Sequence, residues 1–230
     1  MELEKITNTP DKTEKRRYDD ACGTALGMEL VGERWSLLIV RELLLGPRRF
    51  GELRAGLPAI SANILTQRLE SLEAAGIVAR RKLPPPASVQ VYELTPWGAE
   101  CEPIVLGIGR WALRSPAHDP TLNFSPVALM LSLKMLVVPE RLGDLRAAIG
   151  FRFGAETYVA QVADGKITVA RGDLAGMDAV FDAAPNALLR IFYGKRPVEE
   201  LEASGALRLS GDRVRAIRLA GLFSLPEKLA

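Results

Sequence analysis

Apolar residues in the first half of the chain recur every three or four positions, and glycine or proline separates one such run from the next. This spacing is typical of helices that bury one side against a core. It predicts four helices, which run from Asp19 or Asp20 to Gly32, from Trp35 to Gly46, over Phe50–Ala55 and over Ser61–Ala75. Ser61 is a favourable N-cap for the fourth helix, and Leu65, Leu69 and Leu72 form its apolar stripe.

Two β-type runs follow, Ile77–Leu83 and Val89–Thr95. The prolines at 84–86 would interrupt a central strand, so they indicate the exposed tip of a hairpin. A proline then opens another helix, expected over residues 96–114. Residues 18–115 therefore have the element order of a winged helix-turn-helix domain, mostly helical with a β-hairpin wing.

The second half has a different pattern, which predicts an α+β domain over residues 127–230 after a proline-containing linker at 116–126. Helical spacing covers residues 126–149, and Asp164-Gly165 joins two alternating runs, 157–162 and 166–171, into a predicted hairpin. Further strands are expected at 178–182 and 206–209, and further helices at 185–193, 198–203 and 212–220. The polar residues 1–17 are expected to form a flexible tail.

The overall charge allows a nucleic-acid site only as a local patch. The chain has 230 residues and a net charge of +2, so the molecule as a whole is not a polycation. Residues 48–82 contain seven arginines and lysines and three glutamates, which leaves an excess of four positive charges. Because 48% of the residues are hydrophobic, the chain can build a core without disulfide or metal cross-links.

Motifs of catalysis, metal binding and export are absent from the sequence. It contains no nucleophile elbow, phosphate loop or zinc-protease motif, and its single histidine, His118, falls in the linker. Cys22 and Cys101 are too few for a disulfide framework, and their spacing is not a metal motif. The N-terminus lacks a signal-peptide core, and the most apolar stretch, Val127–Val138, is shorter than the ~18–20 residues that cross a bilayer. We therefore predict a cytoplasmic protein that is not an enzyme and needs no cofactor or metal.

The exposed side of the helix over 61–75 carries side chains that read DNA bases. Asn63 and Gln67 lie opposite the leucine stripe with Thr66 beside them, and Asn and Gln pair bidentately with adenine. Such helices enter the major groove with their N-terminal residues, which brings Ser61 and Ala62 to the bases as well. An ordinary solvated helix face is the alternative.

Phosphate contacts give affinity without sequence information, and basic or hydroxyl side chains near the hairpin and the second turn can make them. The candidates are Arg48, Arg49, Arg80, Arg81, Lys82 and Ser88. Arg49 has a helix-capping role as its alternative. Arg68 lies close to the leucine stripe, so we expect it to form a salt bridge within the protein.

The motifs RW-x-LLI-x-REL, RRF-x-EL, IS-x-x-x-LTQRL-x-x-LE-x-x-G and Y-x-LT-x-x-G occur in this order between Cys22 and Arg114. In order and spacing they resemble the HxlR-type winged-helix transcriptional regulators, relatives of the MarR group. The resemblance implies that 61–75 is the recognition helix, that 82–89 is the wing and that the first and last helices form a dimer. It also implies a pseudo-palindromic operator of double-stranded DNA and, in the usual mode, repression. The residues expected to face the partner subunit are Ile104, Ile108 and Trp111.

Cys22 occupies the position of a family cysteine that senses oxidants or electrophiles in some relatives. Arg16 and Arg17 are near in sequence and would lower the pKa of the thiol. The alternative is a small, inert apolar residue at a dimer interface. Gly23 and Val91 depart from the family pattern, in which proline and glutamate are frequent at these positions.

Residues 155–226 contain three recognisable features. These are the predicted hairpin, a helix that ends at Gly194, and the motif G-x-L-x-L-x-GD before the last helix. These features resemble the sterol carrier protein type 2-like domains. The resemblance implies an apolar cavity for lipid-like molecules, lined by Phe181, Leu188, Phe192, Leu207, Leu209, Leu219 and Phe223. The alternative is that these side chains fill the core, because an empty cavity costs ~24 cal/mol per Å³. The domain would then only enlarge the dimer interface.

Together these features predict a dimeric regulator that binds a specific sequence of double-stranded DNA. An apolar small molecule in the C-terminal domain, or modification of Cys22, would control it. The alternative is a lipid carrier whose winged helix serves only for interaction, which leaves the motifs of the first half unused.

Overall fold

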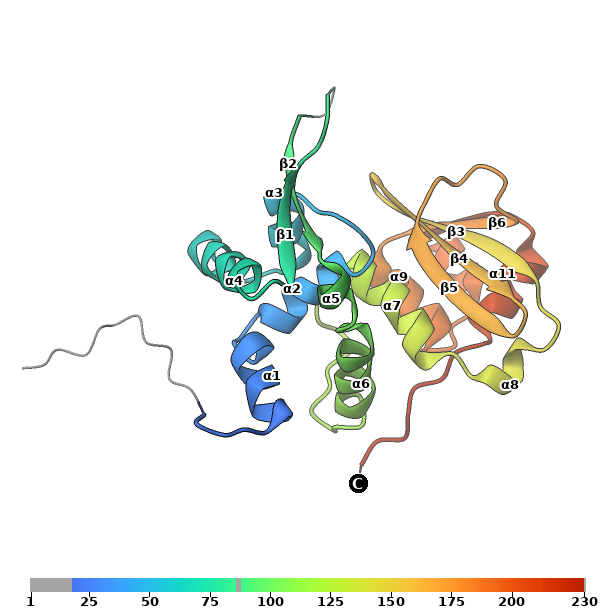
Figure 1. Ribbon diagram of the computed structural model, residues 1–230. Coiled ribbons are helices and arrows are strands. Elements are labelled where there is room, and N and C mark those ends of the chain that lie inside the picture. Colours follow the sequence, from blue (N-terminus) through green and yellow to red (C-terminus); the bar gives the residue numbers. More distant parts are fainter. Residues whose placement is uncertain (1–17, 86–87, 230) are drawn as a thin grey trace, which may run out of the picture.

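The computed structural model describes residues 18–85 and 88–229, and its first half has the predicted order of helices and hairpin (Figure 1). The elements are α1 (Gly23–Val31), α2 (Ser36–Leu43), α3 (Phe50–Gly56), α4 (Ala62–Ala74), β1 (Val78–Lys82), β2 (Gln90–Leu94), α5 (Pro96–Ala99) and α6 (Glu102–Ala112). The predicted final helix is divided into α5 and α6. Pro103 explains the division, because it lacks the N–H that would bond to the carbonyl one turn earlier.

The first half has its own core, built on the leucine stripe of α4. Leu65, Leu69 and Leu72 are all buried against residues of α2 and β1, as the spacing predicted. Ser61 caps α4, since its hydroxyl accepts a hydrogen bond from the N–H of Ile64 at 3.3 Å. The cap and the stripe together fix which side of α4 faces solvent.

The hairpin of β1 and β2 projects from this core as a wing (Figure 1). Its strands are antiparallel, with Arg80 opposite Tyr92. A second contact joins Tyr92 to Arg48, which precedes α3, through two backbone hydrogen bonds of 2.9 and 2.8 Å. Residues 86–87 of the predicted wing, and the predicted tail 1–17, lie outside the described residues.

The second half contains helices and one mixed sheet of five strands. The elements are α7 (Pro126–Leu136), α8 (Pro139–Leu142), β3 (Ala147–Phe153), β4 (Glu156–Ala163), β5 (Lys166–Arg171), β6 (Ala179–Ala183), α9 (Pro185–Phe192), α10 (Val198–Ala203), β7 (Leu207–Gly211) and α11 (Arg213–Ala220). The strand order is β5-β4-β3-β6-β7, in which β3 and β6 are parallel and the other neighbours are antiparallel. Asp164 and Gly165 both have positive φ, as the predicted tight hairpin turn requires.

The central strand, β3, corrects the prediction of helical structure up to residue 149. Ile149, Phe151 and Phe153 point into the core, but Ala148 and Gly150 occupy the other face. Small residues on that face hide the alternation of apolar and polar positions that identifies a strand. A Cβ at Gly150 would come within 2.8 Å of a side-chain methyl of Leu174, so a larger residue there would require Leu174 to shift.

Helix α7 lies between the two halves, and eight of its 11 residues are buried. It contacts β4, β5 and α9 of its own half and α2 and α6 of the first half (Figure 1). A helix that is apolar all round belongs in such a place, because each of its faces meets another element. Within the described residues, no helix has the length and apolar character needed to span a membrane.

The seven residues predicted to line a cavity form the core of the second half, which corrects that prediction. The rings of Phe181 and Phe192 lie 5.6 Å apart between centroids, and Phe192 lies equally close to Phe223. Leu188, Leu207 and Leu219 are buried in the same cluster, and Leu209 packs against it. These side chains therefore fill the space that the prediction left for a ligand.

Candidate nucleic-acid interface

The exposed face of α4 presents the predicted base-reading side chains together. Asn63, Thr66 and Gln67 are exposed, and Ser61 lies at the exposed start of the helix with the half-buried Ala62. Asn63 and Gln67 are one turn apart, so their amides project on the same side. The buried stripe behind them holds the helix in place, which presents the amides on a rigid support.

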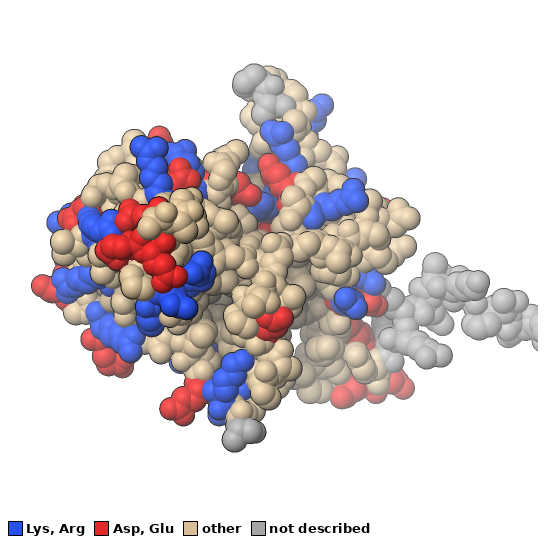
Figure 2. Space-filling model, turned by 180° about the vertical axis from the view of Figure 1, so that it is seen from behind, with Lys and Arg blue, Asp and Glu red and all other residues tan. Residues whose placement is uncertain are grey.

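Basic side chains of the wing flank this helix. Figure 2 shows Lys and Arg side chains on the projecting hairpin. Arg80 is paired with Glu73 at 2.8 Å and Arg81 with Glu93 at 2.9 Å, and both arginines are exposed. Exposed ion pairs contribute only ~0–1 kcal/mol, so a phosphate can compete for these guanidinium groups.

The remaining phosphate candidates differ in their surroundings. Lys82 and Ser88 are exposed on the wing. Arg49 is the N-cap residue of α3, where its backbone N–H donates to Glu52 at 2.8 Å, and its side chain is exposed. Arg49 therefore occupies the capping position and still presents its guanidinium group to solvent.

Arg68 forms the salt bridge within the protein that the sequence predicted. Its guanidinium group lies 2.9 Å from Glu33 and also donates to the backbone carbonyl of Arg34 at 3.2 Å. Both partners belong to the segment between α1 and α2. Arg68 thus fastens α4 to that segment and is not assigned to DNA.

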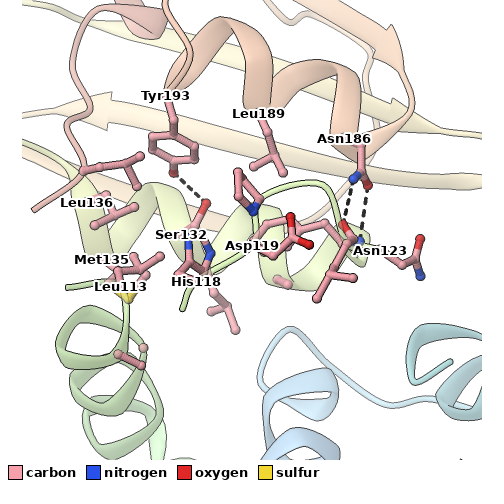
Figure 3. A pocket seen from close by; sticks show the side chains of 18 of the residues that line it. Leu113, His118, Asp119, Asn123, Ser132, Met135, Leu136, Asn186, Leu189 and Tyr193 are labelled. Carbon is pink, nitrogen blue, oxygen red and sulfur yellow. Dashed lines mark hydrogen bonds between the residues drawn. The ribbon is translucent and has the colours of Figure 1, made fainter. Parts of the chain in front are cut away.

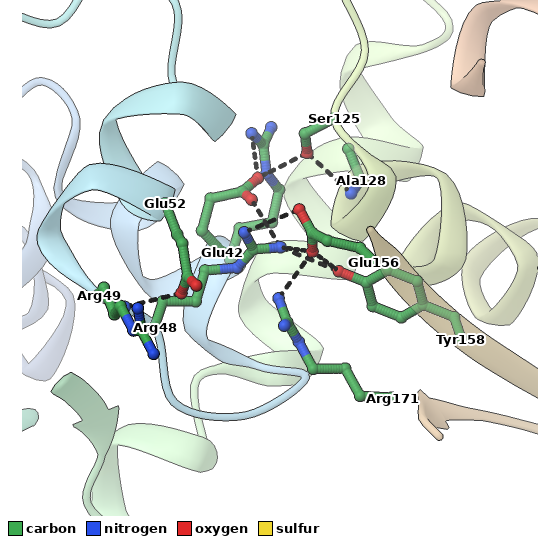
Figure 4. A network of polar contacts seen from close by, with 10 residues as sticks. Glu42, Arg48, Arg49, Glu52, Ser125, Ala128, Glu156, Tyr158 and Arg171 are labelled. Atoms are coloured by element: carbon green, nitrogen blue, oxygen red, sulfur yellow. Dashed lines mark hydrogen bonds and ion pairs between the residues drawn. The ribbon is translucent and has the colours of Figure 1, made fainter. Parts of the chain in front are cut away.

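The prediction that Arg48 contacts phosphate is wrong, because its side chain is buried in the protein. Its side chain is 2% exposed, and its guanidinium group donates to Glu156 at 2.8 Å and to Tyr158 at 2.9 Å (Figure 4). The backbone pairing of Arg48 with Tyr92 directs the side chain into the contact between the two halves. Because its partners follow more than 100 positions later, no local sequence pattern reveals this role.

The predicted dimer residues form an unpartnered apolar face on α6. Ile104, Ile108 and Trp111 are exposed, and Trp111 is 75% exposed. Leu26 and Met28 of α1 are exposed as well, and both helices lie at the end of this half that is opposite the wing in Figure 1. An exposed stripe of large apolar side chains is typical of an interaction surface.

The two cysteines have opposite environments. Cys22 is the exposed N-cap residue of α1, where the nearby backbone N–H and hydroxyl of Thr24, and the N–H of Ala25, favour the thiolate and lower the pKa of the thiol. Burial raises the pKa of the Cys101 thiol. Arg16 and Arg17, which the sequence suggested as the cause, lie outside the described residues. Over residues 18–85 and 88–229, no group of three His, Cys, Asp or Glu side chains is arranged to hold a metal ion.

Comparison with known proteins concerns mainly the first half. Residues 30–119 match the family described as HxlR-like helix-turn-helix. The chain is 39% identical over 85 residues to the "Uncharacterized HTH-type transcriptional regulator YvaP" of Bacillus subtilis, a match that covers 37% of this chain and 79% of that protein. It is 37% identical over 83 residues to the HTH-type transcriptional regulator YodB of the same organism, covering 36% and 74%. Both relatives are described as HTH-type transcriptional regulators.

A solved structure, that of the redox regulator HypR in its oxidized form, is 33% identical to this chain. It aligns with a TM-score of 0.38 and covers 40% of this chain and 94% of that chain.

Proposed function

Because this chain belongs to the HxlR-like helix-turn-helix family of transcriptional regulators, we propose that it binds a specific double-stranded DNA sequence through α4 and the wing. The observation that carries the proposal is the exposed set of Asn63, Thr66 and Gln67 on a capped helix whose other side is buried. The major groove of DNA accepts such a helix, and amide side chains there distinguish adenine from other bases. Arg49, Arg80, Arg81, Lys82 and Ser88 would hold the backbone phosphates.

The active form is a homodimer joined through α1 and α6. The apolar faces of these helices support this, since a two-fold dimer buries the same patch on both subunits. Two α4 helices related by such an axis read half-sites about one helical turn, ~34–36 Å, apart. The operator is then pseudo-palindromic, and a dimer bound across a promoter represses it.

The second half is a separate α+β domain, over residues 127–230, that controls the DNA-binding domain. Its mixed sheet and covering helices are compatible with a sterol-carrier-like fold. Its packed core, however, leaves an effector no room among the side chains first assigned to a cavity. Cys22 offers a second route of control, because an exposed thiol with a lowered pKa reacts readily with oxidants and electrophiles.

The test is fluorescence anisotropy of the purified protein with DNA from upstream of its own gene and with a scrambled duplex of the same composition. We expect tight, selective binding that weakens with salt, and the slope of log K against log salt, divided by ~0.9, gives the number of phosphates contacted. Equal weak binding to both duplexes calls for selection of the operator from genomic fragments. Failure to bind either duplex at low salt contradicts the proposal and favours the lipid-carrier alternative.

A further inference from the structure

A pocket of about 610 Å³ opens between the two halves, where no sequence motif predicted one. Helices α6, α7 and α9 and the linker form its walls (Figure 3). Most of the lining is apolar and includes Leu106, Leu113, Leu131, Met135, Leu136 and Leu189. This volume and this lining are typical of sites that take small organic molecules.

The linker is the roof of the pocket and is held in place by side chains of the second half. Asn186 of α9 accepts a hydrogen bond from the N–H of Phe124 at 3.2 Å and donates to the carbonyl of Leu122 at 2.9 Å (Figure 3). Lys228 donates to two earlier carbonyls, those of Ser115 and His118, at 3.1 and 3.3 Å. The roof is thus fixed near both ends, which makes the pocket a formed site.

One polar pair in the pocket wall, the buried Ser132 and the half-buried Tyr193, has a defined hydrogen-bonding direction. The hydroxyl of Ser132 lies 2.7 Å from the carbonyl of Leu129 and 2.6 Å from the hydroxyl of Tyr193. A carbonyl only accepts, so Ser132 donates to Leu129 and Tyr193 donates to Ser132. Burial raises the pKa of Tyr193, which keeps it a neutral phenol. Its oxygen therefore has only lone pairs left, and these accept a hydrogen bond from a ligand hydroxyl.

The charges around the pocket do not favour an anionic ligand. Arg41 is paired with Glu42 at 2.8 Å, and Arg190 is paired with Glu200 at 2.9 Å. Both arginines line the pocket together with the carboxylate of Asp119. A carboxylate ligand would have to compete with Glu42 and Glu200 for these arginines and would face the carboxylate of Asp119, and in its ionised form it has no proton to donate to Tyr193.

Helix α6 connects the pocket to the proposed dimer interface. One side of α6, which includes Leu106 and Gly109, lines the pocket, whereas Ile108 and Trp111 are exposed on the helix. Contact between α6 and α7 is close, since a Cβ on Gly109 would lie 2.9 Å from the sulfur of Met135. A molecule that fills the pocket packs against the inner side of α6, so it favours the position of α6 that fits it best and thereby couples the pocket to the dimer face.

We propose that this pocket binds a neutral apolar molecule with a hydroxyl group, and that its binding moves α6 and weakens operator binding by the dimer. The claim that binding regulates the protein rests on the proposed function, whereas the claim that the molecule binds rests on the pocket alone. A ligand that prefers one position of α6 changes the equilibrium between dimer arrangements by its difference in affinity for them.

Binding is tested by equilibrium dialysis of the full chain with 1-decanol and with its methyl ether, which has no hydroxyl proton. We expect decanol to bind about five-fold more tightly than the ether, as one hydrogen bond allows. Tyr193→Phe removes the acceptor and should abolish this preference. Leu189→Trp fills the pocket and should prevent binding of both molecules, while Ile217→Trp, on the exposed side of α11, should bind as the wild type does.

Circular dichroism confirms that each variant is folded before its binding is compared. Equal binding of decanol and its ether to the wild type would contradict recognition of the hydroxyl group. Binding by Leu189→Trp that matches the wild type would show that decanol lies elsewhere and overturn the pocket assignment.

Regulation is tested by anisotropy with the operator duplex. We expect decanol to weaken DNA binding by the wild type at least about tenfold, within the usual range of allosteric coupling, and to leave Leu189→Trp unchanged. If decanol binds and operator affinity stays the same, the proposed regulation by the pocket is wrong. If the protein binds its operator but not decanol, the pocket inference fails and the proposed function stands. If decanol binds but no duplex does, only the proposed function fails.

Discussion

Arg48 and Glu156 are 108 positions apart in the chain, yet Nη2 of the arginine lies 2.8 Å from Oε2 of the glutamate (Figure 4). Arg171 binds the same carboxylate at 3.0 Å, and Tyr158 donates to it. Glu42, which is 0% exposed, lies 3.9 Å from Arg48. These five residues form the Arg48 network, which joins the loop before α3 to the first turn of the second half's sheet. The network is a direct polar contact between the winged helix and the sheet, in addition to the packing of α7 against both.

Replacing Arg48 should destabilise the protein strongly. In Arg48→Met the carboxylates of Glu42 and Glu156 lose a buried partner, and we expect the free energy of unfolding to fall by about 3 kcal/mol. The control is Arg146→Met, because Arg146 is 73% exposed and its ion pair with Asp164 should contribute at most about 1 kcal/mol. Urea unfolding measures both changes. Equal losses of unfolding free energy would show that the Arg48 network stabilises the protein no more than an exposed ion pair does.

The Arg48 network should weaken in acid through Glu156. Burial by itself raises the pKa of this carboxyl, but the hydrogen bond from Tyr158 and the charges of Arg48 and Arg171 outweigh it and hold the pKa below its ordinary value. The ionised form is thus favoured in the folded state. Its stabilisation is complete above the unfolded pKa, about 4.3, and is lost as the pH falls through the folded pKa.

Urea midpoints measured from neutral pH into this acidic range test the effect. The wild type should lose stability more steeply than Glu156→Gln, in which this position no longer titrates. Parallel curves for the two proteins would exclude Glu156 as a source of the acid sensitivity.

Removing the amides of α4 should reduce selectivity for the operator. Asn63→Ala and Gln67→Ala should each cost about 1–3 kcal/mol of operator binding and leave binding to a scrambled duplex nearly unchanged. Lys82→Ala should weaken binding to both duplexes and reduce the salt slope by ~0.9. Gln161→Ala, at an exposed position of β4, is the matched control. Anisotropy titrations that show no difference between Gln67→Ala and Gln161→Ala would place base recognition elsewhere.

A charge on the apolar face of α6 should separate the dimer. Trp111→Arg and Ile108→Arg would bury unpaired charges in the interface, so sedimentation velocity should find monomers where the wild type forms dimers. Val214→Arg introduces the same charge on α11 at a residue that is 77% exposed, and it should remain dimeric. Dimers of Trp111→Arg as stable as those of the wild type would move the interface away from α6.

Cys22 should react faster than Cys101 with an alkylating agent. The polar groups of Thr24 and Ala25 beside Cys22 lower the pKa of its thiol and so raise its thiolate fraction, whereas burial raises the pKa of Cys101 and lowers its thiolate fraction. Mass spectrometry after treatment with iodoacetamide at neutral pH measures the two rates in one sample. Thr24→Ala should slow the reaction at Cys22 and leave Cys101 unchanged. Similar rates at both cysteines would argue against a sensing role.

The sequence by itself determined the elements that depend on local contacts. Ser61 and Asp212 cap the helices that follow them, and Asp164-Gly165 makes the predicted hairpin turn. The exposed positions of Asn63 and Gln67 also follow from local rules, because a helix with one buried stripe leaves only its other side in solvent. The winged helix and the exposed face of α4 were therefore predictable from local patterns.

Tertiary structure alone decided the features that depend on contacts between distant segments. Arg48 resembles any surface arginine in sequence, and only its partners 108 and 110 positions later bury it. The side chains predicted to line a cavity pack as the core of the second half, and the pocket lies where α6, the linker and α9 meet α7. Ser132, a polar residue within the apolar helix α7, was the one local sign of that wall. Spacing within a segment specifies which side of an element is buried, but the energy of packing one element on another decides what buries it.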